Sequence, residues 1–205
     1  AYESSVMAAK VMRDAAIAAG APENCIQWIE IRGSMYATTA LMNHPGVATI
    51  LATGGNAMVK AAYSCGKPAL GVGAGNVPAY VEKSCVLKRA VNDIVLSKSF
   101  DNGMICASEQ AAIVDHEIYK EFKEEISRFK VYWVNEAEKA KLEKYMFGAE
   151  AYSDKVNEVG TVNANVVGKN ATWIAEQAGF KVPEDTQILL AECKEVGPNE
   201  PLTRE

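Results

Sequence analysis

The feature that most limits the possible folds is a regular alternation of short apolar runs with amphipathic stretches of helical length. Residues 47–51, Val-Ala-Thr-Ile-Leu, are followed by a glycine turn and a helical pattern at 56–63. An apolar, β-branched run of this length is typical of a parallel strand that is buried on both faces. The same order of strand and helix recurs along the chain and predicts an α/β fold with a largely parallel sheet.

The boundaries of the expected elements follow from hydrophobic periodicity and from helix-ending residues. Ser34 is an expected N-cap, and Gly20 and Gly179 are expected to end helices. Helices are expected at 4–19, 34–42, 56–63, 86–98, 116–129, 136–147 and 171–178. Strands are expected at 25–31, 47–51, 69–70, 79–81, 110–114, 131–134 and 187–191.

The composition argues against several classes of function. The 205 residues are 49% hydrophobic and 23% charged, as in a soluble globular protein of one large or two modest domains. A net charge of −5 without a Lys/Arg block argues against a nucleic-acid surface, and no apolar run approaches the ~20 residues of a membrane span. Five widely spaced cysteines and two distant histidines predict no disulfide framework and no metal site, and they favour a reducing cytoplasm.

Residues 99–110 join the helical pattern at 86–98 to the apolar run at 111–114. Within them, Asp101, Asn102 and Gly103 are a strong turn signal, because Asn and Gly tolerate positive φ. Cys106 follows three residues later, so the turn would present a thiol at an element junction, where catalytic groups tend to lie. Position alone leaves two interpretations open: a nucleophile, or a small buried hydrophobic residue, which most lone cysteines are.

Two glycine-rich stretches suggest ligand contact. Thr53, Gly54 and Gly55 stand between a strand and a helix, an arrangement that directs free backbone N–H groups at an anion such as a phosphate or dinucleotide. An ordinary tight turn explains them equally, since glycines serve turns as readily. Residues 71–76 do not form a Rossmann fingerprint, because Asn76 stands where a glycine is needed. Their three glycines suggest close approach of the backbone to something flat.

The run at 100–110, Phe-Asp-Asn-Gly-Met-Ile-Cys-Ala-Ser-Glu-Gln, resembles the active-site segment of the aldehyde dehydrogenase superfamily in its CoA-acylating branch. The likeness is strongest to the N-terminal aldehyde dehydrogenase half of bifunctional aldehyde-alcohol dehydrogenases. It implies a Rossmann-type dinucleotide-binding domain plus an α/β catalytic domain, both incomplete in this chain. Residues 1–97 would be the C-terminal part of the NAD-binding domain and 98–205 the N-terminal part of the catalytic domain. The chain is accordingly expected to be an internal piece of a larger fold.

The resemblance also implies site residues and a reaction. Cys106 is the implied catalytic nucleophile, and Thr53, Gly54, Gly55 and Gly73 are implied to bind NAD. The implied reaction interconverts acetaldehyde or another short aldehyde, CoA and NAD⁺ with acyl-CoA and NADH through a thioester on the cysteine. The implied partners are the small aldehyde, CoA and further copies of the chain, with filament formation open for the full-length protein.

One missing carboxylate distinguishes two branches of the superfamily. Hydrolytic members carry a glutamate within a Glu-Leu-Gly-Gly pattern, whereas residues 72–75 here are Val-Gly-Ala-Gly. Water needs such a base to attack a thioester, whereas a partly ionised CoA thiol does not. The sequence therefore favours acyl transfer to CoA. A hydrolytic aldehyde dehydrogenase, a cysteine acyltransferase without a redox step and a non-catalytic self-association module remain the alternatives.

Overall fold

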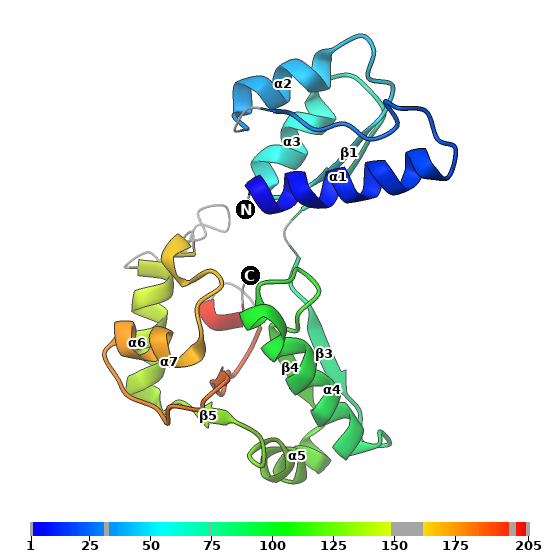
Figure 1. Cartoon of the computed structure of the whole chain (residues 1–205). Coiled ribbons are helices and arrows are strands. Elements are labelled where there is room, and N and C mark those ends of the chain that lie inside the picture. Colours follow the sequence, from blue (N-terminus) through cyan, green and yellow to red (C-terminus); the bar gives the residue numbers. More distant parts are fainter. Residues whose placement is uncertain (1, 31–32, 74, 149–161, 197–199, 204–205) are drawn as a thin grey trace. The chain divides into compact units, whose positions relative to one another are not determined.

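The computed structural model describes residues 2–30, 33–73, 75–148, 162–196 and 200–203, and it divides into two compact units, Ala1–Gly73 and Ala74–Glu205 (Figure 1). Among the described residues, the strands form three pairs, and all three pairs are parallel. The predicted α/β class with parallel pairing is therefore confirmed. In the described part of the chain, no helix has both the length and the apolar character needed to cross a membrane.

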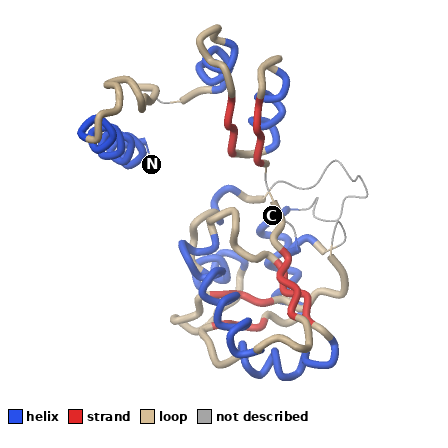
Figure 2. The backbone as a smooth tube through the Cα atoms, turned by 90° about the vertical axis from the view of Figure 1, so that its right-hand side faces the viewer, coloured by secondary structure: helices blue, strands red, loops and turns tan. Residues whose placement is uncertain are grey.

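The first unit contains a β–α–β arrangement, in which a helix connects two parallel strands that lie side by side (Figure 2). Ile50 and Ala52 of one strand are buried with Ala62 of the connecting helix and with Met42. The described elements of this unit are α1 (Tyr2–Ala18), α2 (Met35–Asn43), β1 (Ile50–Thr53), α3 (Asn56–Ser64) and β2 (Ala69–Val72).

The helix α3 approaches the strand β2 closely at Gly71. A Cβ atom at Gly71 would lie 2.6 Å from Val59 Cγ1 and 2.7 Å from Tyr63 Cε2. The Gly71 N–H donates a hydrogen bond of 2.9 Å to Tyr63 Oη, which holds the ring in place. Any larger residue would force the helix or the Tyr63 ring to move, so this glycine has a packing role.

The second unit carries two pairs of parallel strands and the helices that cover them. The strand β3 pairs with β4, and β5 pairs with β6. The described elements are β3 (Pro78–Val81), α4 (Leu87–Ser99), η1 (Phe100–Gly103), β4 (Ala111–Val114), η2 (His116–Ile118), α5 (Tyr119–Ile126), β5 (Val131–Trp133), α6 (Glu136–Phe147), η4 (Ala164–Val166), α7 (Ala171–Ala178), β6 (Ile188–Leu190) and η5 (Pro201–Thr203).

The β5–β6 pair separates two hydrophobic cores. Ile188 belongs to a first core with side chains of α4, α5 and β3, namely Val81, Val91, Val95, Phe122 and Ile126. Leu189, the next residue, packs against a second core that joins α6 and α7, namely Leu142, Ala175 and Phe180. Successive side chains of a strand point to opposite faces, so this sheet is covered on both sides, as parallel sheets usually are.

Two expected strands differ from the structure by more than two residues at one end. Residues 25–30 of the strand predicted at 25–31 have no regular secondary structure apart from bends at 25–26 and at 30, and residue 31 lies outside the described residues. That prediction was wrong because no described strand pairs with the segment. It packs on α1 instead, where the Arg13 guanidinium lies 5.1 Å from the ring centre of Trp28. The strand predicted at 47–51 begins at Ile50 and continues to Thr53, since its register is set by pairing with β2.

The compact units divide at Gly73, whereas the predicted functional boundary lies near Ser97. The strand β3 pairs with β4, and α4 packs in the first core, so both elements share their packing with residues that follow them. The predicted division into a cofactor-binding part, 1–97, and a catalytic part, 98–205, concerns function rather than compactness and stays a prediction.

Candidate active site

The turn that precedes Cys106 has an unusual backbone. After α4 ends, Asp101, Asn102 and Gly103 have φ of 50°, 53° and 69°. Glycine adopts this left-handed conformation freely, and Asn and Asp adopt it more readily than other residues with a Cβ atom, for which it costs roughly 1–2 kcal/mol. The positive φ expected at Asn102 and Gly103 is confirmed, and Asp101 adds a third such residue. Two strained residues in succession are typical of functional sites, where surrounding contacts hold the strain.

The thiol of Cys106 is exposed and forms no disulfide. The interpretation of Cys106 as a small buried hydrophobic residue is therefore wrong. Exposure alone does not single it out, because Cys25 is exposed as well. The distinguishing feature of Cys106 is its place after a strained turn, in the segment 99–110 that we call the Cys106 loop. The other three cysteines are partly buried: Cys65, Cys85 and Cys193.

A hollow of about 550 Å³ borders both chain neighbours of Cys106. Large apolar side chains dominate its wall, and Leu96 and Phe100 are 67% and 62% exposed. An apolar hollow with few polar groups suits the hydrocarbon part of a small molecule. Its lining residues are Asp93, Leu96, Ser97, Phe100, Ile105 and Ala107.

Polar side chains that were not predicted as site residues from the sequence lie where the Cys106 loop meets α4; Ser108 is buried, and Lys98, Glu109 and Gln110 are partly buried. Lys98 Nζ donates a hydrogen bond of 3.0 Å to Gln110 Oε1. Burial lowers the pKa of Lys98, and the nearby carboxylate of Glu109 opposes that shift. Ser108 is 1% exposed, and its Oγ and Glu109 Oε2 have no hydrogen-bond partner among the described residues. In the predicted helix 86–98, Lys98 lies on the same face as the apolar residues. A lysine on that face was the sequence signal that could have identified it.

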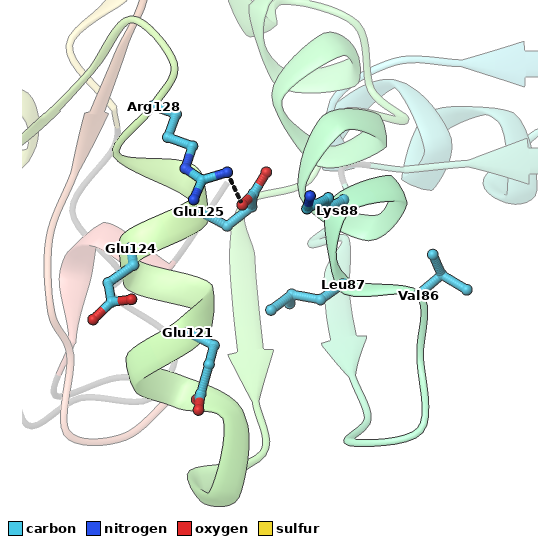
Figure 3. A pocket seen from close by; sticks show the side chains of 7 residues that line it. All are labelled: Val86, Leu87, Lys88, Glu121, Glu124, Glu125 and Arg128. Carbon is cyan, nitrogen blue, oxygen red and sulfur yellow. Dashed lines mark ion pairs between the residues drawn. The ribbon is translucent and has the colours of Figure 1, made fainter.

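A second pocket, of about 340 Å³, lies between the start of α4 and α5 (Figure 3). Three glutamates give it an acidic wall, and Arg128 pairs with one of them, Glu125, at 2.8 Å. None of its lining residues belongs to the Cys106 loop, so it is separate from the candidate nucleophile. Its lining residues are Val86, Leu87, Lys88, Glu121, Glu124, Glu125 and Arg128. Within the described ranges, no group of three or more His, Cys, Asp or Glu is placed to hold a metal ion.

The predicted cofactor-binding residues lie together in the first unit, at the carboxyl ends of β1 and β2. Thr53 is the last residue of β1 and is paired with Val72, and Gly73 follows β2 directly. Gly54 N–H donates to the Val72 carbonyl at 3.1 Å. Carboxyl ends of neighbouring parallel strands are where α/β proteins bind ligands. The structure thus brings Thr53, Gly54, Gly55 and Gly73 together, while Cys106 belongs to the second unit.

Gly55 begins α3 and differs from Gly71 in what surrounds it. Its φ of −64° and ψ of 163° are open to any residue, and no side chain caps the helix there. A Cβ atom at Gly55 would have no described atom within 4 Å. Neither backbone conformation nor internal packing therefore requires a glycine at this position. Open space before uncapped helix N–H groups can accept an anionic ligand.

Comparison with known proteins places these features in a family. The aldehyde dehydrogenase family model matches residues 1–188. Aldehyde-alcohol dehydrogenase 2 of Entamoeba histolytica is 68% identical over 205 residues, which are all of this chain and 23% of that protein. The chain therefore spans about a quarter of the length of the curated relatives it matches.

Two solved structures are also similar. An acetylating aldehyde dehydrogenase from Geobacillus thermoglucosidasius has 45% identity and a TM-score of 0.83, with 96% of this chain and 41% of that chain covered. A propionaldehyde dehydrogenase from Rhodopseudomonas palustris, solved with bound CoA and an acylated cysteine, has 32% identity and a TM-score of 0.77, with 94% and 42% covered. The resemblance drawn from residues 100–110 is confirmed, and the chain belongs to the aldehyde dehydrogenase family.

Proposed function

We propose that this chain is part of an NAD-dependent, CoA-acylating aldehyde dehydrogenase that interconverts acetaldehyde, or another short aldehyde, with its acyl-CoA. The observation that carries the proposal is the exposed thiol of Cys106, which follows a strained turn beside an apolar hollow. The hollow would receive the aldehyde's hydrocarbon group, and the thiol would meet its carbonyl carbon.

Cys106 supplies the nucleophile of the proposed reaction. Its thiolate attacks the aldehyde carbonyl, a carbon–sulfur bond forms, and the carbonyl oxygen becomes the oxyanion of a thiohemiacetal. The backbone N–H of Cys106 itself would be a local donor to that oxyanion. The thiohemiacetal carbon then loses a hydride, and the carbonyl re-forms as a thioester on Cys106.

The first unit offers the residues that would hold the nicotinamide cofactor. The cofactor's role when bound is to accept the hydride. The open space at Gly55 and the uncapped start of α3 suit its phosphates. Thr53, Gly54 and Gly73 lie at the same strand ends and would contact it through the backbone. We infer NAD rather than NADP as the partner of these residues.

The last step transfers the acyl group to CoA. The CoA thiolate attacks the thioester carbon, the bond to Cys106 breaks, and the cysteine leaves as a thiolate. The similar propionaldehyde dehydrogenase with CoA and an acylated cysteine supports this order. The absence of a carboxylate at 72–75 argues against hydrolysis, since water would lack its base.

The partners and compartment follow from the same proposal. Besides the aldehyde and CoA, we propose further copies of the enzyme as partners. The five described cysteines are free thiols, which fits a reducing cytoplasm.

Replacing Cys106 tests the proposal. In the full-length protein, Cys106→Ala and Cys106→Ser should abolish aldehyde oxidation, while NAD⁺ still binds. With CoA present, the wild-type protein should convert the aldehyde to acyl-CoA; without CoA, it should release no free acid. Free acid formed without CoA would favour a hydrolytic enzyme. Acyl transfer without any change in NADH absorbance would favour a plain acyltransferase, and substantial acyl-CoA reduction by Cys106→Ala would remove the cysteine from the mechanism.

A further inference from the structure

The left-handed turn at residues 101–103 needs contacts from elsewhere to persist. Its two residues with Cβ atoms occupy an unfavourable backbone region, and Asn102 lies at the centre of the turn. Local bonds are few: Met104 N–H donates to the Asp101 carbonyl at 3.2 Å. Strained backbone of this kind is retained only where surrounding structure fixes it.

A distant glycine, Gly168, contacts the turn twice. Asn102 Nδ2 donates a hydrogen bond of 3.0 Å to the Gly168 carbonyl, across 66 positions of sequence. A Cβ atom at Gly168 would lie 3.4 Å from Met104 Sδ, so the Met104 side chain packs on the same residue. Both contacts come from residues within four positions of Cys106.

The residues on either side of Gly168 are held in place. Val166, the last residue of η4, is buried, and its carbonyl accepts a hydrogen bond of 3.0 Å from Lys169 N–H. Asn170 caps α7 by accepting from Trp173 N–H at 2.9 Å. Gly168 therefore sits between two fixed elements and can serve as an anchor.

The two contacts connect different cores of the second unit. The helix α4, which leads into the Cys106 loop, packs in the first core, whereas α7, which follows Gly168, packs in the second. The Asn102 side chain therefore ties the end of α4 to the α6–α7 core. The two ends of the loop, α4 and β4, both belong to the first core, so the Asn102 contact is what fixes the middle of the loop to the second core as well.

We propose that Asn102 is a positioning residue for Cys106, which acts by hydrogen-bonding its side-chain amide to the Gly168 carbonyl. The inference rests on the proposed role of Cys106 as nucleophile. It differs from the simpler idea that asparagine stands here only because it tolerates positive φ. Glycine at 102 would keep that tolerance and lose the amide, so it separates the two explanations.

Three variants of the full-length protein test the inference. Asn102→Gly removes the amide, and Asn102→Asp keeps the shape but replaces the donor with a carboxylate. Asn92→Asp is the matched control, because Asn92 is exposed on α4 and, among the described residues, its amide donates to the adjacent Asp93, at 3.4 Å. Amide hydrogen exchange of residues 100–108 and the single-turnover rate of cysteine acylation by acetyl-CoA are measured for each.

In both Asn102 variants, exchange in the segment should rise about fivefold, which corresponds to roughly 1 kcal/mol, the typical net contribution of one hydrogen bond. The maximal acylation rate should fall by about fivefold or more, because near-attack geometry is sensitive to small displacements. The acetyl-CoA concentration giving half of that rate should change less than about twofold, since binding groups are untouched. Asn92→Asp should match the wild type in all three.

Wild-type exchange and acylation rates in Asn102→Gly would overturn the inference and leave asparagine as a turn former only. Loss of a cooperative thermal transition in that variant would also overturn it, since Asn102 would then serve stability. Absence of any acylation in the wild type would instead reject the proposed function. The exchange measurement would still report whether Asn102 fixes the loop.

Discussion

Replacing Gly55 should separate cofactor binding from folding. The conformation of Gly55 is open to any residue, and a Cβ atom there would meet open space. As an N-cap, alanine is about 0.5–1 kcal/mol less favourable than glycine, but it also restricts the unfolded chain by about 0.4–1 kcal/mol. The two effects nearly cancel. The free energy of unfolding of the Gly55→Ala protein should therefore stay within about 0.5 kcal/mol of the wild type.

Gly71→Ala is the matched control, because there the new Cβ atom would lie 2.6 Å from Val59 Cγ1. Normal contact is about 3.5–4.0 Å, so helix α3 or the Tyr63 ring must move by roughly 1 Å. Overpacking of this kind destabilises the folded state by about 1–3 kcal/mol. The lower conformational entropy of the unfolded chain offsets less than about 1 kcal/mol of that loss. We expect Gly71→Ala to destabilise the protein by about 1–2 kcal/mol.

Calorimetric titration with NAD⁺ and denaturant unfolding of the full-length protein measure the two effects. Gly55→Val should raise the dissociation constant for NAD⁺ at least about tenfold, equivalent to 1.4 kcal/mol of lost binding, with little change in stability. Gly73→Val should behave likewise. In the Gly71→Ala variant, the loss of folding stability should be larger than the loss of affinity for NAD⁺. Wild-type affinity in both valine variants would show that these glycines form ordinary turns and would refute their assignment to the cofactor.

Three further predictions concern stability, thiol chemistry and association. Lys139→Met removes the positive partner of the buried carboxylates of Glu143 and Glu200, and denaturant unfolding should show a loss of about 3 kcal/mol in stability. Lys83→Met is the control: it breaks the exposed pair with Glu117 and should change stability by less than about 1 kcal/mol. Burial raises the pKa of Cys193 to about 11, so at pH 8 only about one thiol in a thousand is ionised and its alkylation should be slow by peptide mapping. The Cys193 thiol keeps its proton to a higher pH in the folded state than in the unfolded state. The contribution of this thiol to folding stability should therefore fall as the pH rises from about 9 to about 11. The 205-residue chain made alone should self-associate in sedimentation experiments, because the outer face of the β1–β2 pair exposes Leu51 and Leu70 to 76% and 65%; a monodisperse monomer would contradict this.

Local patterns predicted the elements well where the local sequence determines them. The helix expected at 136–147 has those bounds, because Asn135 and Glu138 form a capping box at its start and Gly148 follows its end. The helix at 171–178 likewise begins after the N-cap Asn170 and ends before Gly179, whose φ is +88°. Such signals act within a few residues, so they can be read from the sequence.

Pairing between distant segments could not be read in this way. The apolar run 47–51 predicted a strand, but its register is set by β2, so the strand is displaced toward Thr53. The turn before Cys106 drew attention to the thiol, and the resemblance of residues 100–110 to a family motif implied its role as nucleophile. The contact between Asn102 and Gly168 spans 66 positions and has no local signature. The sequence therefore predicts the loop that carries Cys106, but it does not predict the distant residue, Gly168, that holds the loop.

The most direct test of the account is the covalent state of Cys106 in the full-length protein during reaction with acetyl-CoA. Brief incubation without NADH, followed by acid quench and peptide mass spectrometry, should show one acetyl group on the peptide that contains Cys106. Free CoA should appear in equal amount, and the label should disappear on addition of NADH as acetaldehyde forms. Cys106→Ala should show no label. An acetyl group on another cysteine, or turnover of acetyl-CoA with Cys106 unlabelled and replaceable, would contradict the account.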